Sequence, residues 1–219
     1  MIAWVYEHAR QAACLDHLLV ATDAPEIQSY CRAQGIPAMM TSRAHRSGTD
    51  RMAEVMAREP AEIYVNIQGD EPMITPGHLE LLLQPFGAAP TAQVSTLKVA
   101  IDTETALDPN VVKVITDRAG RALYFSRARI PYDRDGSKQV QYYKHQGFYA
   151  FSAAALNQFH HLPPSPLEKL EKLEQLRFLE NGIGIAVVET PHDTIGVDTE
   201  EDLRGVEEYF HRMHSRLER

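Results

Sequence analysis

The chain of 219 residues has the size of one large domain, or of one domain that carries an insertion. Hydrophobic residues make up 44% of it and charged residues 24%, which is ordinary globular usage and excludes a fibrous or wholly disordered chain. The formal net charge of −8, with Lys and Arg scattered, argues against a nucleic-acid partner, so an anionic ligand needs local cations or a metal.

The two cysteines and the absence of long apolar runs bear on the compartment. Cys14 and Cys31 lie in apolar helical contexts without CxxC spacing, and we expect both to be reduced thiols in the core. The sequence shows neither a signal-peptide pattern nor an apolar run long enough for a bilayer, so a cytoplasmic protein is expected.

The first half of the chain is predicted to alternate helices and strands. Apolar spacing predicts helices over residues 1–13, 25–34, 49–58 and 76–84, and buried strands over 18–23, 36–41 and 63–67. The first helix has no preceding residue that could cap it, so the chain opens inside an amphipathic helix. The alternation favours the α/β class, with a mostly parallel sheet covered by crossover helices.

The second half is richer in strands. They are predicted over residues 94–100, 111–116, 122–125, 147–151 and 185–189, with helices over 153–159, 167–180 and 199–217. Residues 117–120, DRAG, are typical of a hairpin turn. Leucines recur at every third residue from Leu167 to Leu179, and we expect a helix that packs this face on the core or on a partner. The simplest division is one domain over residues 1–219 with a β-rich insertion.

The first candidate site follows the strand predicted over residues 63–67. Residues 68–72, QGDEP, stop that strand, because Gly69 frees the backbone and Pro72 cannot continue the hydrogen-bond ladder. In an open α/β sheet, ligands bind beyond the carboxyl ends of strands. Asp70 and Glu71 at such a place could hold Mg²⁺ together with substrate phosphates. The alternative is an acidic turn that faces water.

Two helix starts form the next candidates. Residues 47–51, SGTDR, offer backbone N–H groups and polar side chains to a small planar or anionic ligand; the alternative is an ordinary cap by Ser47 or Thr49. Asp198, before an acidic helix start, could complete a metal site with Asp70. The alternative is that Asp198 is the N-cap of the following helix, or that Thr199 and Asp202 form a capping box there.

Cations form the last group. An anionic substrate needs partners such as Arg127, Arg129, Lys144 and His145, although each alone is more often a surface charge. Glu174 and Gln175 lie off the leucine face and are available for hydrogen bonds. The remaining histidines show no HExxH pattern and are assigned no metal.

Taken together, these strings are too specific to be separate coincidences. The chain resembles the 3-deoxy-D-manno-octulosonate cytidylyltransferase (CMP-Kdo synthetase) family, in family order and over nearly its whole length. The matching strings are SGTDR at 47–51, VNIQGDEPMI at 65–74, ALYFSR at 122–127, IPYDR at 130–134, KHQG at 144–147, PSPLE at 164–168, LEQLR at 173–177 and GVDT at 196–199.

The resemblance implies a Rossmann-like nucleotidyltransferase, usually a homodimer, that serves lipopolysaccharide biosynthesis. It would join CTP and 3-deoxy-manno-octulosonate (Kdo) to give CMP-Kdo and pyrophosphate. The anomeric hydroxyl of Kdo would attack the α-phosphorus of CTP in line, with Mg²⁺ as the cofactor that neutralises phosphate charge.

The resemblance also implies roles for individual residues. Asp70 and Asp198 would be the metal carboxylates and, with Arg127, the catalytic residues. Nucleotide contacts would come from Ser47 and Arg51 at the cytosine and from Gln68. The residues around Kdo would be Arg127, His145, Tyr149, Glu174 and Gln175, with the cations facing its carboxylate and the last two facing its hydroxyls.

One departure from the family pattern is large. The family opens with a strand and a PARxxSxRLPGKPL loop that cradles the triphosphate, and Met1-Ile2 of this chain aligns just after that loop. We therefore expect the N-terminal strand of the sheet to be missing and strand edges to be exposed. The alternatives to a Kdo enzyme are a cytidylyltransferase for a related sugar acid (8-amino-Kdo or sialic acid) and a truncated, inactive remnant.

Overall fold

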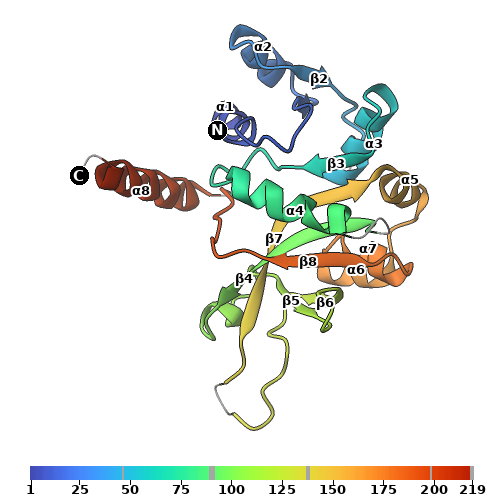
Figure 1. Cartoon of the computed structure of the whole chain (residues 1–219), viewed down its shortest axis with the longest axis vertical. Helices are drawn as coiled ribbons and strands as arrows, with labels where there is room; N and C mark the ends of the chain where they lie inside the picture. Colours follow the sequence, from blue (N-terminus) through green and yellow to red (C-terminus); the bar gives the residue numbers. More distant parts are fainter. Residues whose placement is uncertain (46, 89–91, 137–138, 198, 218–219) are drawn as a thin grey trace.

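The computed structural model describes residues 1–217 apart from residues 46, 89–91, 137–138 and 198, and it describes side chains up to residue 210. A central sheet is flanked by helices, which confirms the predicted α/β class (Figure 1). The helices are α1 Ile2–Ala9, α2 Pro25–Ala33, α3 Gly48–Arg58, α4 Pro76–Ala88, α5 Ala153–His161, α6 Pro166–Glu171, α7 Leu176–Glu180 and α8 Glu200–Leu217. The strands are β1 Val20–Thr22, β2 Ala38–Met40, β3 Ile63–Asn66, β4 Val94–Ile101, β5 Lys113–Thr116, β6 Ala122–Ser126, β7 Tyr142–Ser152 and β8 Ile185–Glu189.

The described sheet is mixed, and the expectation of mostly parallel strands is wrong. Its order is β6-β5-β7-β4-β8, with β3 also paired to β7. Only β4–β8 and β1–β2 pair in parallel, whereas β3–β7, β4–β7, β5–β6 and β5–β7 are antiparallel. The reason lies in the second half of the chain, where a hairpin and the long β7 return the chain antiparallel to its neighbours.

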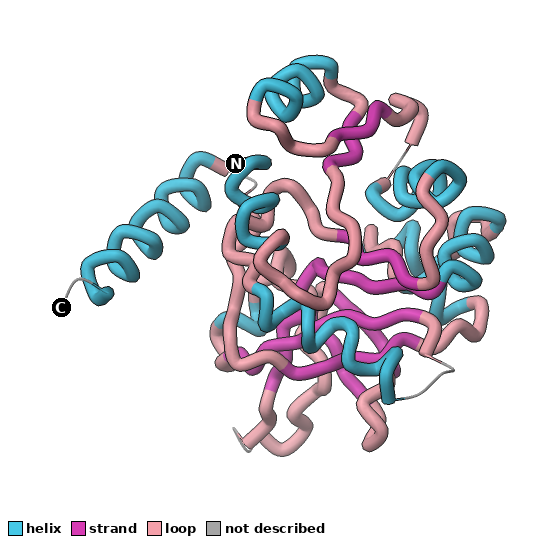
Figure 2. Tube along the Cα trace, turned by 45° about the horizontal axis from the view of Figure 1, so that its top comes forward, coloured by secondary structure: helices cyan, strands magenta, loops and turns pink. Residues whose placement is uncertain are grey.

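The first two strands stand apart from the rest. Strands β1 and β2 form a separate two-stranded sheet, and among the described strands β3 pairs only with β7. Figure 2 shows this pair with α2 above the larger sheet. These pairings agree with the expectation of open strand edges.

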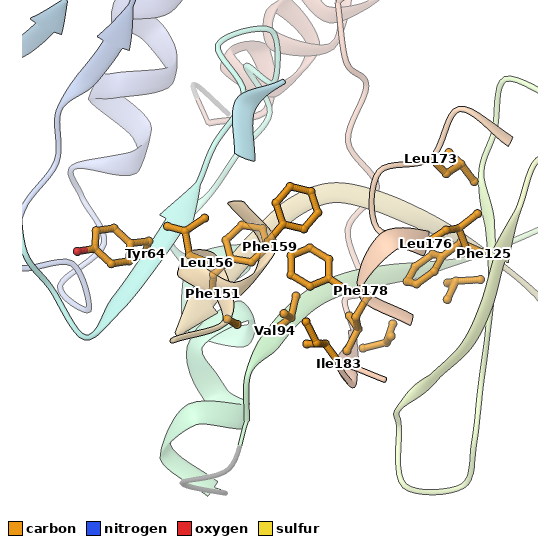
Figure 3. Packing of buried hydrophobic residues seen from close by; sticks show 14 residues of the cluster. Tyr64, Val94, Phe125, Phe151, Leu156, Phe159, Leu173, Leu176, Phe178 and Ile183 are labelled. Atoms are coloured by element: carbon orange, nitrogen blue, oxygen red, sulfur yellow. The ribbon is translucent and has the colours of Figure 1, made fainter. Parts of the chain in front are cut away.

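Helices cover both faces of the larger sheet. On one face, aromatic rings from β7, α5 and α7 stack, with centroid separations of 5.6 Å for Phe151–Phe178 and 4.5 Å for Phe159–Phe178 (Figure 3). On the other face, Val5 of α1 and Leu79 and Leu82 of α4 pack against β4 and β7. Each fully buried side chain of this size stabilises the fold by roughly 1.5–3 kcal/mol. Strand β7 therefore runs through the centre of the molecule.

The single helix predicted over residues 167–180 is wrong. The chain forms α6 and α7 instead, separated at Lys172, whose φ of 56° lies in the left-handed region. A spacing of three residues rotates a helical position by about 60° at each step, so the five leucines cannot share one face. The break lets Leu173 and Leu176 reach the core while Leu170 stays 79% exposed.

The cysteines differ in burial. Cys31 is buried as expected, but Cys14 is exposed. Helix α1 ends at Ala9 rather than at residue 13, and Cys14 lies in the turn that follows it. Within the described part of the chain, none of the helices has the length and apolar character needed to cross a membrane.

Candidate functional site

The loop after β3 lies at the centre of the candidate site. It turns tightly, with the backbone N–H of Glu71 donating to the Gln68 carbonyl at 3.2 Å. The Asp70 carbonyl accepts from the backbone N–H of Val197 at 2.8 Å, which ties this loop to the segment after β8. Asp198 lies outside the described residues, but its neighbour Val197 is thus in contact with Asp70.

Glu71 is a largely buried carboxyl group in the same loop. A Cβ atom added at Gly147 or Gly196 would lie 3.5 Å or 3.6 Å from its Oε1, so the carboxyl group packs beside both glycines. Its Oε2 is buried without a hydrogen-bond partner among the described residues. Burial, and then the charge of Asp70, raise the pKa of Glu71 to about 7.

The start of α3 packs against this loop. The Ser47 side chain caps the helix by accepting from the backbone N–H of Asp50 at 3.2 Å, so the capping role, named above as the alternative, is present in the structure. A Cβ atom on Gly48 would lie 2.7 Å from Gln68 Nε2 and 3.0 Å from Asn66 Nδ2. Glycine at this position permits the close approach, which brings the first turn of α3 against the amides of Gln68 and Asn66. Asn66 was not predicted as a site residue, because it lies inside the strand predicted over residues 63–67.

Arg51, also on α3, reaches the two-stranded sheet. Its guanidinium donates to Asp23 Oδ2 at 3.2 Å and to the hydroxyl of Thr41, at the ends of β1 and β2. The Arg51 hydrogen bond holds the pKa of Asp23 below its usual value. Arg51, which is predicted to bind the nucleotide, is therefore linked to the end of β1 through Asp23, a residue that no sequence motif indicated.

The break between α6 and α7 places Glu174 against the start of α3. Burial raises the pKa of Glu174, while hydrogen bonds from the hydroxyls of Ser47 and Thr49 oppose the shift. Gln175 is buried at the start of α7. A residue predicted to bind sugar thus meets residues predicted to bind nucleotide, because the helix is interrupted.

His145 and Tyr149 lie on β7, on the face of Phe125. The ring centroid of His145 is 5.1 Å from that of Phe125 and 5.3 Å from that of Tyr149. Burial, with a smaller effect of Lys144, lowers the pKa of His145 to about 3, so the imidazole is neutral at pH 7. In the unliganded chain the ring therefore differs from the cation that the resemblance implied. The Tyr149 hydroxyl is buried, and the polar side chain beside it is that of Thr96.

The predicted cations are already engaged. The Arg127 guanidinium donates to the carbonyls of Glu171 at 2.8 Å and Pro109 at 3.1 Å. Lys144 Nζ contacts Asp193 Oδ1 and the Thr194 carbonyl, both at 2.8 Å. The described contacts of Arg127 link β6 to α6 and do not include the other predicted site residues.

Asp70 is the described residue on which the expected metal site depends. These residues contain no group of three or more His, Cys, Asp or Glu side chains that could hold a metal by themselves. Mg²⁺ needs only one or two carboxylates when phosphates and water complete its octahedron. Asp70, next to the partnerless oxygen of Glu71 and to the segment that carries Asp198, fits such a site.

The chain is similar to known cytidylyltransferases. The cytidylyltransferase family model matches residues 1–189. Relatives called 3-deoxy-manno-octulosonate cytidylyltransferase are 55% identical in Acidobacterium capsulatum and 52% in Koribacter versatilis, over 95% of this chain and 84% and 79% of theirs. A solved structure described as CMP:2-keto-3-deoxy-manno-octonic acid synthetase complexed with CTP superposes with a TM-score of 0.93 at 43% identity, covering 97% of this chain and 88% of the other.

Proposed function

The chain belongs to the cytidylyltransferase family and is an enzyme of the 3-deoxy-manno-octulosonate type, and we propose that it activates Kdo at the site around Asp70. The reaction joins CTP and Kdo to give CMP-Kdo and pyrophosphate. One observation carries this placement: Ser47, Gln68 and Glu174 meet at the start of α3, beside the loop that bears Asp70.

The nucleotide end of the site is assigned to α3. The helix presents free backbone N–H groups at its first turn, which suit the carbonyl and ring nitrogen acceptors of cytosine. Ser47 and the Gln68 amide stand beside them and add donors and acceptors for the edge of the base. This arrangement orients CTP without a cluster of cations, in agreement with the acidic composition of the chain.

The sugar end is assigned to β7 and the α6–α7 break. The buried hydroxyl of Tyr149, which lies beside Thr96, is proposed to meet the sugar acid, and Glu174 with Gln175 provides hydrogen-bond groups for sugar hydroxyls. Arg127 is proposed to meet the carboxylate of Kdo, in exchange for its bonds to the carbonyls of Pro109 and Glu171.

Asp70, together with Asp198, is proposed to hold Mg²⁺. When bound, the ion would neutralise charge on the triphosphate. The protein's own contribution is to hold Asp70 in place. The hydrogen bond from the Val197 N–H to the Asp70 carbonyl and the packing of Glu71 beside Gly147 and Gly196 both restrain the loop that carries it.

The test is release of pyrophosphate from CTP by the purified chain, with and without Mg²⁺, in the presence of Kdo, 8-amino-Kdo or sialic acid. We expect release with CTP and Kdo that chelation of the metal abolishes. A preference for another sugar acid would move the assignment to the related-substrate alternative. A folded chain that releases no pyrophosphate with any of them would overturn the proposed activity.

A further inference from the structure

Thr96 on β4 is a fully buried hydroxyl residue with several polar contacts at the candidate site, among them the nearby Tyr149 hydroxyl. Its Oγ1 lies 2.8 Å from the Phe148 carbonyl, 3.1 Å from the Gln146 carbonyl and 3.0 Å from His145 Nε2. All three partners belong to β7, about fifty positions along the chain, so sequence spacing gives no hint of the contact.

The contacts fall at an irregularity of the sheet. Thr96 pairs with Tyr149 and Leu97 pairs with Gln146, so one step on β4 faces three steps on β7. Gly147 and Phe148 are the two extra residues, and they form a β-bulge. A bulge leaves backbone groups outside the regular ladder, and a side-chain hydroxyl that reaches their carbonyls can satisfy them.

Counting protons assigns the roles of these groups. A threonine hydroxyl has one proton, and a carbonyl can only accept. If the Thr96 proton goes to the nearer carbonyl, that of Phe148, then His145 Nε2 must carry the hydrogen that it shares with Thr96 Oγ1. Because burial keeps the ring neutral, its other nitrogen, Nδ1, is then a hydrogen-bond acceptor.

We propose that Thr96 is a positioning residue, whose hydroxyl holds the β7 bulge and fixes His145 in the tautomer protonated at Nε2. The Nδ1 atom then offers an acceptor that suits a hydroxyl of the sugar acid and cannot pair with its carboxylate. The statement about the sugar rests on the proposed function, whereas the statement about the tautomer does not. The bulge, the tautomer and the selection of a hydroxyl are consequences of one buried side chain.

The test uses three variants of the full chain. Thr96→Val removes the hydroxyl at nearly constant shape, and Thr96→Ser keeps it. Ser95→Ala is the matched control, because the Ser95 hydroxyl is equally buried on the neighbouring position of β4 but has no partner among the described residues. The tautomer is read from ¹⁵N shifts of the histidine ring nitrogens, with His145→Gln to identify the signals.

We expect protonated Nε2 in the wild type, Thr96→Ser and Ser95→Ala, and a mixture of tautomers in Thr96→Val. The KM for Kdo should rise about five- to tenfold in Thr96→Val alone, the loss of one hydrogen bond, while the KM for CTP stays within about twofold. A wild type protonated at Nδ1, or a Thr96→Val protein with unchanged tautomer and KM, would overturn the proposal, and the wild-type spectrum decides even if Thr96→Val does not fold. Failure of the wild type to release pyrophosphate would instead refute the proposed function. The ¹⁵N spectra would still decide whether Thr96 fixes the His145 tautomer.

Discussion

Burial, rather than clustered charge, sets the chemistry of individual residues at this site. It raises the pKa values of Glu71, Glu174 and Tyr149 and lowers that of His145, so each of these groups is shifted toward its neutral form. Neutral groups donate and accept hydrogen bonds without repelling an anionic substrate. Asp70 is thereby left as the carboxylate best suited to a cation.

Replacing Asp70 tests that distinction. Asp70→Asn keeps the shape of the side chain but removes its charge, and it should lower kcat by about 100-fold or more, since a lost metal interaction costs several kcal/mol in the transition state. Pyrophosphate release measures the loss, and circular dichroism should show an unchanged fold. The control is Asp16→Asn, an exposed aspartate before β1 that should leave turnover unaltered. Turnover near the wild-type value in Asp70→Asn would remove this residue from the mechanism.

His145 predicts a pH dependence of stability. Its pKa falls from 6.5 to about 3 on folding, so between these values the unfolded chain binds a proton that the folded protein does not. The free energy of unfolding is therefore unaffected by this proton above pH 6.5. Below that pH it falls by about 1.4 kcal/mol per pH unit, because the unfolded chain gains the proton. Urea unfolding between pH 7.5 and pH 4.5 should show a shallower decline for His145→Gln than for the wild type. Parallel declines would contradict the burial of this ring.

At the level of secondary-structure elements, the contact between α3 and the loop after β3 depends on Gly48. Gly48→Ala would push its Cβ onto Gln68 Nε2, 2.7 Å away, and the flexible amide should move aside. We expect little loss of stability, because alanine gains up to about 1 kcal/mol of helix propensity, but a several-fold higher KM for CTP. The matched control is Gly205→Ala in α8, where no neighbour lies within 4 Å. Equal KM values for CTP in the two variants would show that Gln68 takes no part in nucleotide binding.

A buried ion pair holds α6 against α7 across the break that positions Glu174. Arg177 donates from Nε to Glu168 Oε2 at 2.8 Å, and the two side chains are only 7% and 13% exposed. Arg177→Met leaves the Glu168 charge buried and should lower the free energy of unfolding by about 3–5 kcal/mol. Arg121→Met, which breaks a pair with Asp117 in which Arg121 is 70% exposed, should cost less than about 1 kcal/mol. Similar losses of unfolding free energy in Arg177→Met and Arg121→Met, measured by urea unfolding, would contradict the greater burial of the Arg177–Glu168 pair.

The sequence predicts these elements unevenly. The loop after β3 and the cap of α3 were predictable, because glycine, proline and serine act on the backbone within a few residues. The position of the break in helix 167–180 was not, since the rotation of the leucine series shows that one helix cannot bury all five leucines but does not say where the helix ends. The direction of most strand pairs, and the contact of Thr96 with β7, depend on pairing between distant segments, which no local pattern encodes.

For the molecule as a whole, we expect a homodimer, as the family resemblance implies. Sedimentation equilibrium should give twice the chain mass of 24.7 kDa. Leu170, which is 79% exposed on α6, is the member of the leucine series that stays outside the core, and Leu170→Glu should weaken association. Leu203→Glu on α8, a position 40% exposed, serves as the comparison. A single-chain mass at tens of micromolar would refute the dimer.

The bulge in β7 also limits how the length of this chain can vary. Side chains alternate between the two faces of a sheet, and the bulge adds two residues, so His145 and Tyr149 remain on the face of Phe151 on either side of it. Deleting Gly147 together with Phe148 would leave a regular ladder with the faces unchanged. Deleting Gly147 alone would leave one extra residue, which must either be held as a one-residue bulge or turn every side chain on one side of it to the opposite face. An even change in length between Gln146 and Tyr149 is therefore compatible with the core without a bulge, whereas an odd change requires one.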